Sequence, residues 1–559
     1  MNRALFKNIW RLEEEKMMAY TINDRYLIAE IEGNYKAYIG AKTETDPETP
    51  YTGVMQEVYE DTYSIAQKEA LKLNITMTKS DFKMTFDKLE YPLDDEITEQ
   101  LTAIIGEKDE IPYSKVKELD KLWCDLLRKS INCLRYFDTR EPFMFDRSKK
   151  SVAYGIDQLE DYHNKYTQFE SMLYGASEYY RDHIFHSIRT WLVGIFCLLH
   201  GDDESRFIDN IQIDGVAERE PFANKINIFE KLSMWTIAAL CHDLGYPLEK
   251  SQQILDRTKN MMKEFVSNPT VFSNFAFNGI QDSINEYIVK FMSTKMKSAN
   301  NYNPSEQDET IYNGRIQPKY YLKYTKSLEK SKHGIISAVI VYKMLLYFLE
   351  SDFNLNDDYI YKTEDARQFY IRREILRSIS SHTCTDIYNV KNTTFSSLLY
   401  LCDEMQEWGR KSWNDLYTNV NPEAVTLSIE KFDSESIEYN EEIKMENIKE
   451  DELIVDNIAR LYTRQFETYE LIFRDGQYTN SRAFNLKKGI KIIAGKDGAK
   501  DNNFDIIYSL QAKEANEFVI DISNSQIKKD VLARLLCQKL KVSSLPDVIK
   551  IISKTSKKK

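Results

Sequence analysis

The chain has 559 residues, enough for about two to four domains, and its 42% hydrophobic and 29% charged composition is that of an ordinary soluble globular protein. A net charge of −13 argues against general coating of nucleic acid, although a local basic channel stays open. The seven cysteines include no CxxC pair, which favours reduced thiols over a zinc knuckle or a disulfide framework. The first residues lack the apolar core of a signal peptide, and the longest apolar run, 191–199, is too short to span a bilayer. We therefore expect a cytoplasmic protein without membrane contact.

Residues 1–150 form the first expected region, which carries no concentrated chemical signal and is interpreted as a scaffold or sensor. Apolar side chains alternate over residues 26–39, which predicts a short hairpin that turns at residues 32–34. The low content of glycine and proline in the whole chain favours helices over a loop-rich all-β fold. The apolar period predicts them over residues 62–73, 97–105 and 113–134.

The second region, residues 151–415, holds the candidate site residues, the first of them on a helix. An apolar stripe at helical spacing runs over residues 184–199. His186 shares a helix face with Arg189 at i+3 and with Asp182 at i−4. A core histidine whose ring binds a backbone carbonyl is the alternative to a functional role for His186.

The dipeptide His242-Asp243 ends a second buried helix, and Gly245 and Pro247 follow it as a helix stop. A histidine and an aspartate side by side offer an imidazole nitrogen and a carboxylate to one point in space. A carboxylate can also bridge two cations, so the pair is suited to a two-metal site. Chance His-Asp pairs are common, and the dipeptide alone decides nothing.

Three more candidates follow a long insertion at residues 251–330, which is interpreted as a lid or a disordered segment. His333 opens an apolar helix, and His382 ends another helix over residues 367–381. Asp403 lies on the apolar face of a third helix, where burial would be costly without a cation.

Residues 416–559 differ in character and are interpreted as a small α+β domain with a basic tail. Strands are expected at residues 424–429, 436–443, 489–494, 504–508 and 517–522, and helices at residues 453–473 and 531–540. Neither a GxxxxGKS/T nor a GxGxxG phosphate loop occurs in the chain.

Four of the seven histidines and two aspartates therefore stand in a fixed order: His186, His242-Asp243, His333, His382 and Asp403. This series resembles the HD superfamily of metal-dependent phosphohydrolases. That family places a first His, a His-Asp pair and a later Asp on successive helices, and its two-metal members add two histidines before the last Asp. The local sequences similar to the family's motifs are His186-Ser-Ile-Arg, His242-Asp243-Leu-Gly, His333-Gly-x-x-Ser-Ala and Leu401-Cys-Asp403-Glu, within roughly residues 165–415.

The resemblance implies a mainly α protein: an HD-domain helical bundle with a mostly helical N-terminal region and the small C-terminal α+β domain. It also implies two divalent metal ions bridged by Asp243. The other implied ligands are His186, His242 and Asp403 for the first ion, and His333 and His382 for the second. Imidazole and carboxylate ligands suit Mn, Fe, Ni, Co or Zn, with Mg at a carboxylate-rich edge. Two such ions, about 3.5–4 Å apart, would activate a bridging water for attack on phosphorus.

The chain departs from some family members at the leaving-group acid. Those members carry a lysine shortly after the Asp-x-Gly turn, where this chain has Tyr246-Pro247, with Lys250 only nearby. We expect His183, one turn from His186, to act as this acid, and Asp243 to be catalytic through the metal ions that it bridges. A surface or supporting histidine is the alternative for His183.

Phosphate binding is expected from Arg189, because its planar guanidinium matches the geometry of a phosphate. The alternative for Arg189 is an ion pair with Asp182 on the same helix. Arg410 is a second and weaker candidate for the same role.

The expected function is hydrolysis of a phosphodiester or phosphoanhydride bond in a nucleotide or nucleotide signal, so the expected partner is a small phosphorylated substrate. One alternative is an HD-type nuclease that binds single-stranded nucleic acid along a basic track. The lysines available for such a track, which also fit a solvated loop, are Lys295, Lys297, Lys319, Lys323 and Lys326. A second alternative is a non-catalytic regulator that binds a ligand or partner, and a homo-oligomer also stays open.

Overall fold

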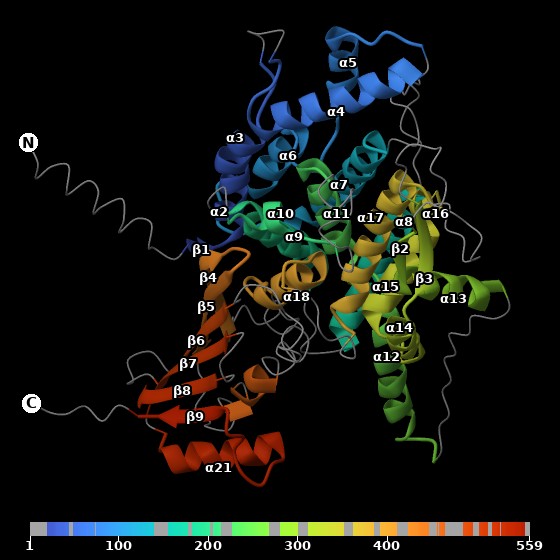
Figure 1. Ribbon diagram of the computed structural model, residues 1–559. Coiled ribbons are helices and arrows are strands. Elements are labelled where there is room, and N and C mark those ends of the chain that lie inside the picture. The colour runs from blue at the N-terminus through green and yellow to red at the C-terminus, as the bar shows by residue number, and fades with distance from the viewer. Residues whose placement is uncertain are drawn as a thin grey trace, which may run out of the picture.

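The computed structural model describes residues 20–43, 49–72, 74–138, 155–176, 182–201, 205–213, 226–267, 280–299, 311–350, 361–384, 392–410, 423–446, 455–456, 458–463, 485–495, 502–511, 517–525 and 527–553. These residues form a mainly helical body, from which a mostly antiparallel sheet extends on one side (Figure 1). None of their helices has the length and apolar content needed to cross a membrane.

The hairpin expected over residues 26–39 is wrong, because these residues are helical. α2 (Asp24–Glu30) begins at Asn23, whose side chain accepts a backbone hydrogen bond from the first turn. A π-helical turn (Ile31–Tyr35) and α3 (Lys36–Ile39) continue it. The alternating apolar residues also contain a four-residue period, which is the one that the fold uses. The side chains buried on that period are Leu27, Ile31, Tyr35 and Ile39.

The three helices expected in the rest of the N-terminal region are confirmed. They are α4 (Gly53–Lys72), α6 (Asp95–Ile105) and α7 (Val116–Tyr136), and α5 (Lys79–Phe86) is an addition. The helices of the next region are α8 (Ile156–Ala176), α9 (Ile184–Leu199), α10 (Phe207–Asn210), α11 (Ile228–Cys241), α12 (Tyr246–Met262), α15 (His333–Met344), α16 (Leu346–Leu349), α17 (Thr363–Ser381) and α18 (Phe395–Met405).

The N-terminal helices pack directly on the helices that carry the candidate site. α7 lies along α11, and the indole of Trp123 donates a hydrogen bond of 3.1 Å to the carbonyl of Leu240. Tyr35 donates to the carbonyl of Phe196 on α9. The domain division at residue 150 stays a prediction, but a continuous apolar core crosses that position.

The described part of the insertion is regular structure. It consists of α13 (Ile280–Ser293), a hairpin of β2 (Thr294–Ala299) and β3 (Ile311–Ile316), and α14 (Pro318–Glu329). Two buried arginines of α17 hold it: Arg373 donates to the carbonyl of Thr294 at 2.8 Å, and Arg377 donates to that of Met292 at 2.6 Å. The lid role stays a prediction, whereas these residues are docked on the body of the protein.

The C-terminal region contains the expected strands in one sheet, ordered β1-β4-β5-β6-β7-β8-β9. The strands are β1 (Tyr20–Ile22), β4 (Glu423–Phe432), β5 (Ser436–Glu446), β6 (Asn485–Gly495), β7 (Asn502–Gln511), β8 (Glu517–Asn524) and β9 (Ile549–Ile552), and α21 (Lys529–Leu540) packs against β9. β5–β6 and β8–β9 are parallel pairs, and β1 joins the edge of β4 from the other end of the chain. Within the helix expected at 453–473, residues 458–463 are helical; its remainder and the basic tail lie mostly outside the described residues.

A buried ion cluster joins this sheet to α18, which lies between the sheet and the helical body in Figure 1. The ammonium of Lys488 on β6 lies 2.9 Å from Glu441 Oε1 on β5 and 3.6 Å from Glu404 Oε1 on α18. All three side chains are buried. Because Glu404 directly follows Asp403, the sheet is anchored beside a candidate metal ligand.

Candidate metal centre

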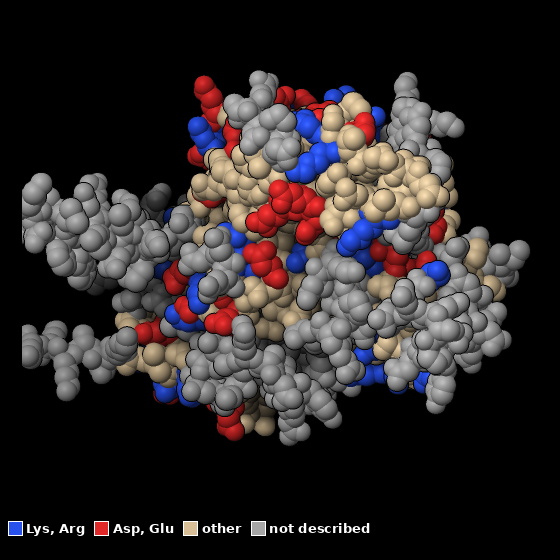
Figure 2. Space-filling model, turned by 45° about the horizontal axis from the view of Figure 1, so that its top comes forward, with Lys and Arg blue, Asp and Glu red and all other residues tan. Residues whose placement is uncertain are grey.

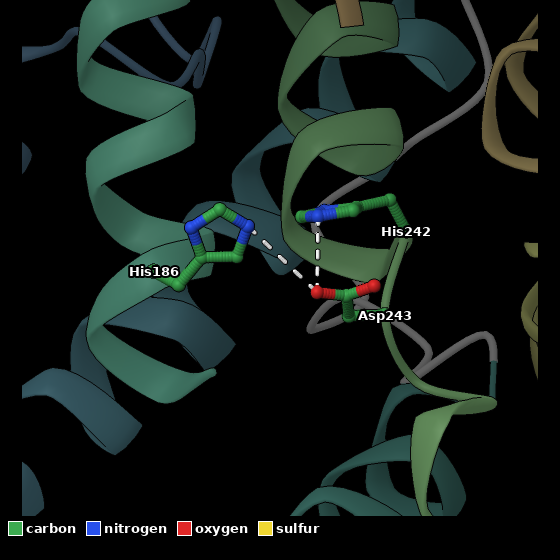
Figure 3. Close-up of side chains that lie close together, drawn as sticks. All are labelled: His186, His242 and Asp243. Carbon is green, nitrogen blue, oxygen red and sulfur yellow. Dashed lines mark ion pairs between the residues drawn. The ribbon is translucent and has the colours of Figure 1, made fainter. Parts of the chain in front are cut away.

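The structure brings all six expected metal ligands together at the ends of five helices. His186 lies in the first turn of α9, and His333 is the first residue of α15. His242 and His382 follow the last residues of α11 and α17, while Asp403 lies near the end of α18. Their ligand atoms form three overlapping groups, each within 4.8 Å, that could hold metal ions. Figure 3 shows the group in which His186 and His242 point at the same oxygen of Asp243.

The carboxylate of Asp243 lies between two pairs of histidines. Its Oδ2 is 3.2 Å from His242 Nε2 and 3.8 Å from His186 Nε2. Its Oδ1 is 3.3 Å from His333 Nε2 and 3.6 Å from His382 Nε2. Each oxygen thus serves a different histidine pair, which is the arrangement that a bridging carboxylate requires.

Asp403 adds a second carboxylate to the first histidine pair. Its Oδ1 lies 2.8 Å from His186 Nε2 and 3.9 Å from His242 Nε2. Asp403 thus lies beside the first histidine pair, and it also forms a possible ligand group with His242 and His382.

Oxygen acceptors fix which nitrogen of each imidazole carries the hydrogen. His242 Nδ1 donates to the carbonyl of Ala239 at 2.7 Å, and His382 Nδ1 donates to that of Ile379 at 2.6 Å. Both rings therefore present Nε2 to the centre, as metal-binding histidines usually do.

Side chains perform the same task for the other two histidines. His333 Nδ1 donates to the Glu249 carboxylate at 2.7 Å. His186 Nδ1 contacts Gln406 Oε1 at 2.5 Å, and Gln406 Nε2 donates to the carbonyl of Trp408 at 2.9 Å. The second bond fixes the orientation of the amide, so its oxygen faces His186.

This donor set fits divalent metal ions. The four Nε2 atoms and the two carboxylates face one another, and in neutral rings that donate through Nδ1 these atoms only accept, so they need a proton or a metal ion between them. His242 Nε2 and His382 Nε2 are buried without a hydrogen-bond partner in the described part of the chain. Burying such atoms and carboxylates without compensation would be costly, and imidazole with carboxylate is a common ligand set for transition metals.

The electrostatics of the centre show how strongly it attracts positive charge. Although burial acts in the opposite direction, the charge and hydrogen bonds of His242, His333 and His382 hold the pKa of Asp243 well below its ordinary value. Burial alone would lower the pKa of His333, but Asp243 and Glu249 raise it to about 9. In the absence of metal, a proton on His333 thus supplies part of the charge that a metal ion would bring.

His183 lies beside the centre, with its ring centroid 6.2 Å from that of His186. Its ring packs at 4.0 Å on Tyr246, and its Nδ1 is 3.4 Å from Glu170 Oε1. Burial lowers the pKa of His183 to about 3, so the imidazole is neutral near neutral pH. A neutral imidazole has no extra proton to give, so this environment does not favour the predicted acid role of His183.

Arg189 has a different partner from either of those expected. Its guanidinium, on a side chain only 2% exposed, binds the buried carboxylate of Asp24 through Nε at 2.9 Å and Nη2 at 2.8 Å, while Nη1 donates to the carbonyl of Gly409 at 3.0 Å. All three nitrogens are therefore engaged within the protein. This arrangement speaks against phosphate binding by Arg189 and gives it a supporting role.

Two supporting residues were missed from the sequence, although each has a local signal. Glu249 stands in the first turn of the helix that follows His242-Asp243, and Gln406 is three residues beyond Asp403, near the same helix face. Their importance depends on His333 and His186, which are remote in sequence.

In comparisons with known proteins, no family model, no curated protein and no solved structure matches this chain, so the geometry of the centre carries the functional argument.

Proposed function

We propose that this protein is a metal-dependent phosphohydrolase that cleaves a phosphodiester or phosphoanhydride bond of a nucleotide or nucleotide signal. The observation that carries the proposal is the position of Asp243, whose two oxygens each face a separate pair of histidines. Two divalent ions bound there would supply an activated water and neutralise the charge that develops on the phosphoryl group.

The side chains of the centre would have distinct tasks. His186, His242 and Asp403 would hold one ion, and His333 and His382 the other, with Asp243 shared between them. Glu249 and Gln406 orient their histidines, which keeps each Nε2 lone pair directed inward. The burial of α9, α11 and α17 limits access of water to the ligands from behind.

The direct test is metal content by elemental analysis of protein purified without added metal. We expect about two ions per chain in the wild type, about one in His333→Ala and almost none in Asp243→Asn. His200→Asn is the matched control, because His200 lies at the far end of α9 and stacks on Phe196. Phosphate release from a panel of nucleotides should fall to background in Asp243→Asn while its circular dichroism spectrum is retained. Fewer than about a tenth of an ion per chain, unchanged after Mn addition, would refute the proposal.

A single-strand nuclease is the second candidate, and the lysines of the insertion favour it. Lys319, Lys323 and Lys326 recur at i, i+4 and i+7 along one side of α14, close to the end of α17. On the described part of the face in Figure 2, however, acidic and basic side chains are interspersed in small groups rather than forming a continuous basic track. Cleavage of a labelled single-stranded oligonucleotide faster than any nucleotide in the panel would favour the nuclease.

A metal-bound regulator would retain both ions yet release no phosphate from either kind of substrate. It would also keep its ligand or partner in Asp243→Asn, whereas a catalyst would lose turnover.

A further inference from the structure

The turn that follows α18 carries a cationic side chain beside the metal centre. Arg410 follows α18 closely, and its Nε is buried and has no hydrogen-bond partner among the described residues. The turn that carries Arg410 begins at Gln406, whose side-chain oxygen contacts His186 Nδ1 at 2.5 Å. The positive charge of Arg410 also acts on His183 and Tyr246, whose rings pack 4.0 Å apart beside the centre.

The turn that carries Arg410 is fixed from three directions. Gln406 binds His186, the Trp408 indole donates to Asp24 Oδ1 at 3.3 Å, and the Gly409 carbonyl accepts from Arg189. Gly409 has a φ of 65°, and a Cβ there would lie 2.6 Å from Arg189 Nη1, so only glycine fits this close approach.

Asp24 fixes this turn through hydrogen bonds that it accepts from Arg189 and Trp408. Its fully buried carboxylate accepts from Arg189, from Trp408 and from the backbone amide of Ile111 at 2.8 Å. The N-terminal region, α9 and the turn after α18 thus meet at a single carboxylate. Arg189 therefore stabilises the turn, and its guanidinium is not available as an anion-binding group.

Arg189 and Arg410 differ in their hydrogen-bond acceptors. A buried guanidinium that serves only stability is normally paired with carboxylates or carbonyls, as Arg189 is. Arg410 is only half-buried, but its Nε is buried at the end of a rigid turn and has no acceptor among the described residues. An anion that enters the site would supply that acceptor, and a guanidinium presents parallel donors that match two phosphate oxygens.

We propose that Arg410 binds a phosphate group of the substrate, and that Asp24 and Arg189 are the positioning residues that hold it there. The proposal rests on the hydrolase function and names the residue that orients the phosphoryl group beside the metal ligands.

The test is a calorimetric titration of the full-length chain, with the metal it retains on purification, with inorganic phosphate. We expect the dissociation constant to rise by about tenfold or more in Arg410→Gln and by less in Arg410→Lys, with metal content unchanged. Arg128→Gln is the control, because Arg128 lies on the surface of α7 in an ion pair with Asp125. Unchanged phosphate affinity in Arg410→Gln, or no phosphate binding by the wild type, would overturn the assignment.

The positioning role has its own readout. Asp24→Asn should weaken phosphate binding in the wild-type background but have little further effect in the Arg410→Gln background, because the two changes act through one guanidinium. A purely structural role would lower stability equally in both backgrounds and leave the dissociation constant unchanged.

Metal content separates this proposal from the function on which it rests. A chain without metal whose phosphate binding still depends on Arg410 would refute the hydrolase and retain the anion site. A metal-loaded, active protein whose phosphate affinity does not change in Arg410→Gln would support the hydrolase and refute the role of Arg410.

Discussion

Replacing Lys488 with methionine tests the ion cluster that joins the sheet to α18. The Lys488 side chain is 1% exposed, and its ammonium is the cation that faces both Glu441 and Glu404. Lys488→Met keeps most of the side-chain volume but leaves two buried carboxylates beside each other. Removing one partner of a buried ion pair costs about 3–5 kcal/mol, and we expect a loss of that size in the free energy of unfolding near pH 7.

The loss should depend on pH in a defined direction. Burial already raises the pKa of Glu441 despite the presence of Lys488, and removing the ammonium would raise it further. A carboxyl whose pKa is raised in the folded state destabilises the fold when ionised, and this cost disappears as pH falls below its ordinary pKa. The difference between Lys488→Met and the wild type should therefore be larger at about pH 8 than at about pH 5.

The neighbouring residue provides a matched control. Lys487 on the same strand pairs with Glu438 at 3.4 Å, but its side chain is 51% exposed. Lys487→Met should change the unfolding free energy by less than about 1 kcal/mol. The assay is equilibrium urea denaturation of both variants at the two pH values. Equal effects of the two substitutions, or a loss in Lys488→Met that grows at low pH, would refute the reasoning.

Three further changes test other parts of the structure. Glu249→Gln removes the charge that orients His333, so metal titration should show an affinity lowered by about 10–100-fold, and an unchanged affinity would contradict the role of Glu249. Gly194→Ala would place a Cβ 1.8 Å from the buried Trp235 ring, so the free energy of unfolding measured by urea denaturation should fall by about 1–3 kcal/mol, and an unchanged value would show that the helices can separate there. Burial and then the charge of Asp182 raise the pKa of Asp120 to about 6, and its side chain is 22% exposed. Asp120→Asn should therefore stabilise the protein by about 1 kcal/mol at about pH 8 and by almost nothing at about pH 4. The assay is thermal denaturation at both pH values. The opposite trend would refute the claim that the ionised Asp120 carboxylate destabilises the folded state.

The residues of the metal centre could be anticipated because each one leaves a local mark. A histidine or aspartate at a helix end, on a face otherwise devoted to the core, is conspicuous in the sequence, and His242-Asp243 was the clearest case. The contacts within the centre, however, link residues that are far apart in the sequence: His186 and Asp403 are 217 positions apart. Spacing alone could not show that His333 and His382 face the second oxygen of Asp243.

The supporting contacts were beyond sequence reasoning for the same reason. The pairing of Arg189 with Asp24 spans 165 positions, and nothing in the local pattern of α9 distinguishes that partner from Asp182. The helical state of residues 26–39 was misassigned because a short apolar alternation satisfies two periods at once. Only burial against α9 decides between them.

The pairing of β1 with β4 has a consequence for the order in which the protein can be built. Residues 20–22 emerge from the ribosome long before residues 427–429, with which they pair, and Asp24 contacts Trp408 across 384 positions. Neither contact can form until most of the chain has been synthesised, so the turn that carries Arg410 is fixed late, after the ligand-bearing helices have been made. A fragment that begins after α2 would lack this closure and leave β4 as a bare strand edge, open to pairing with other chains.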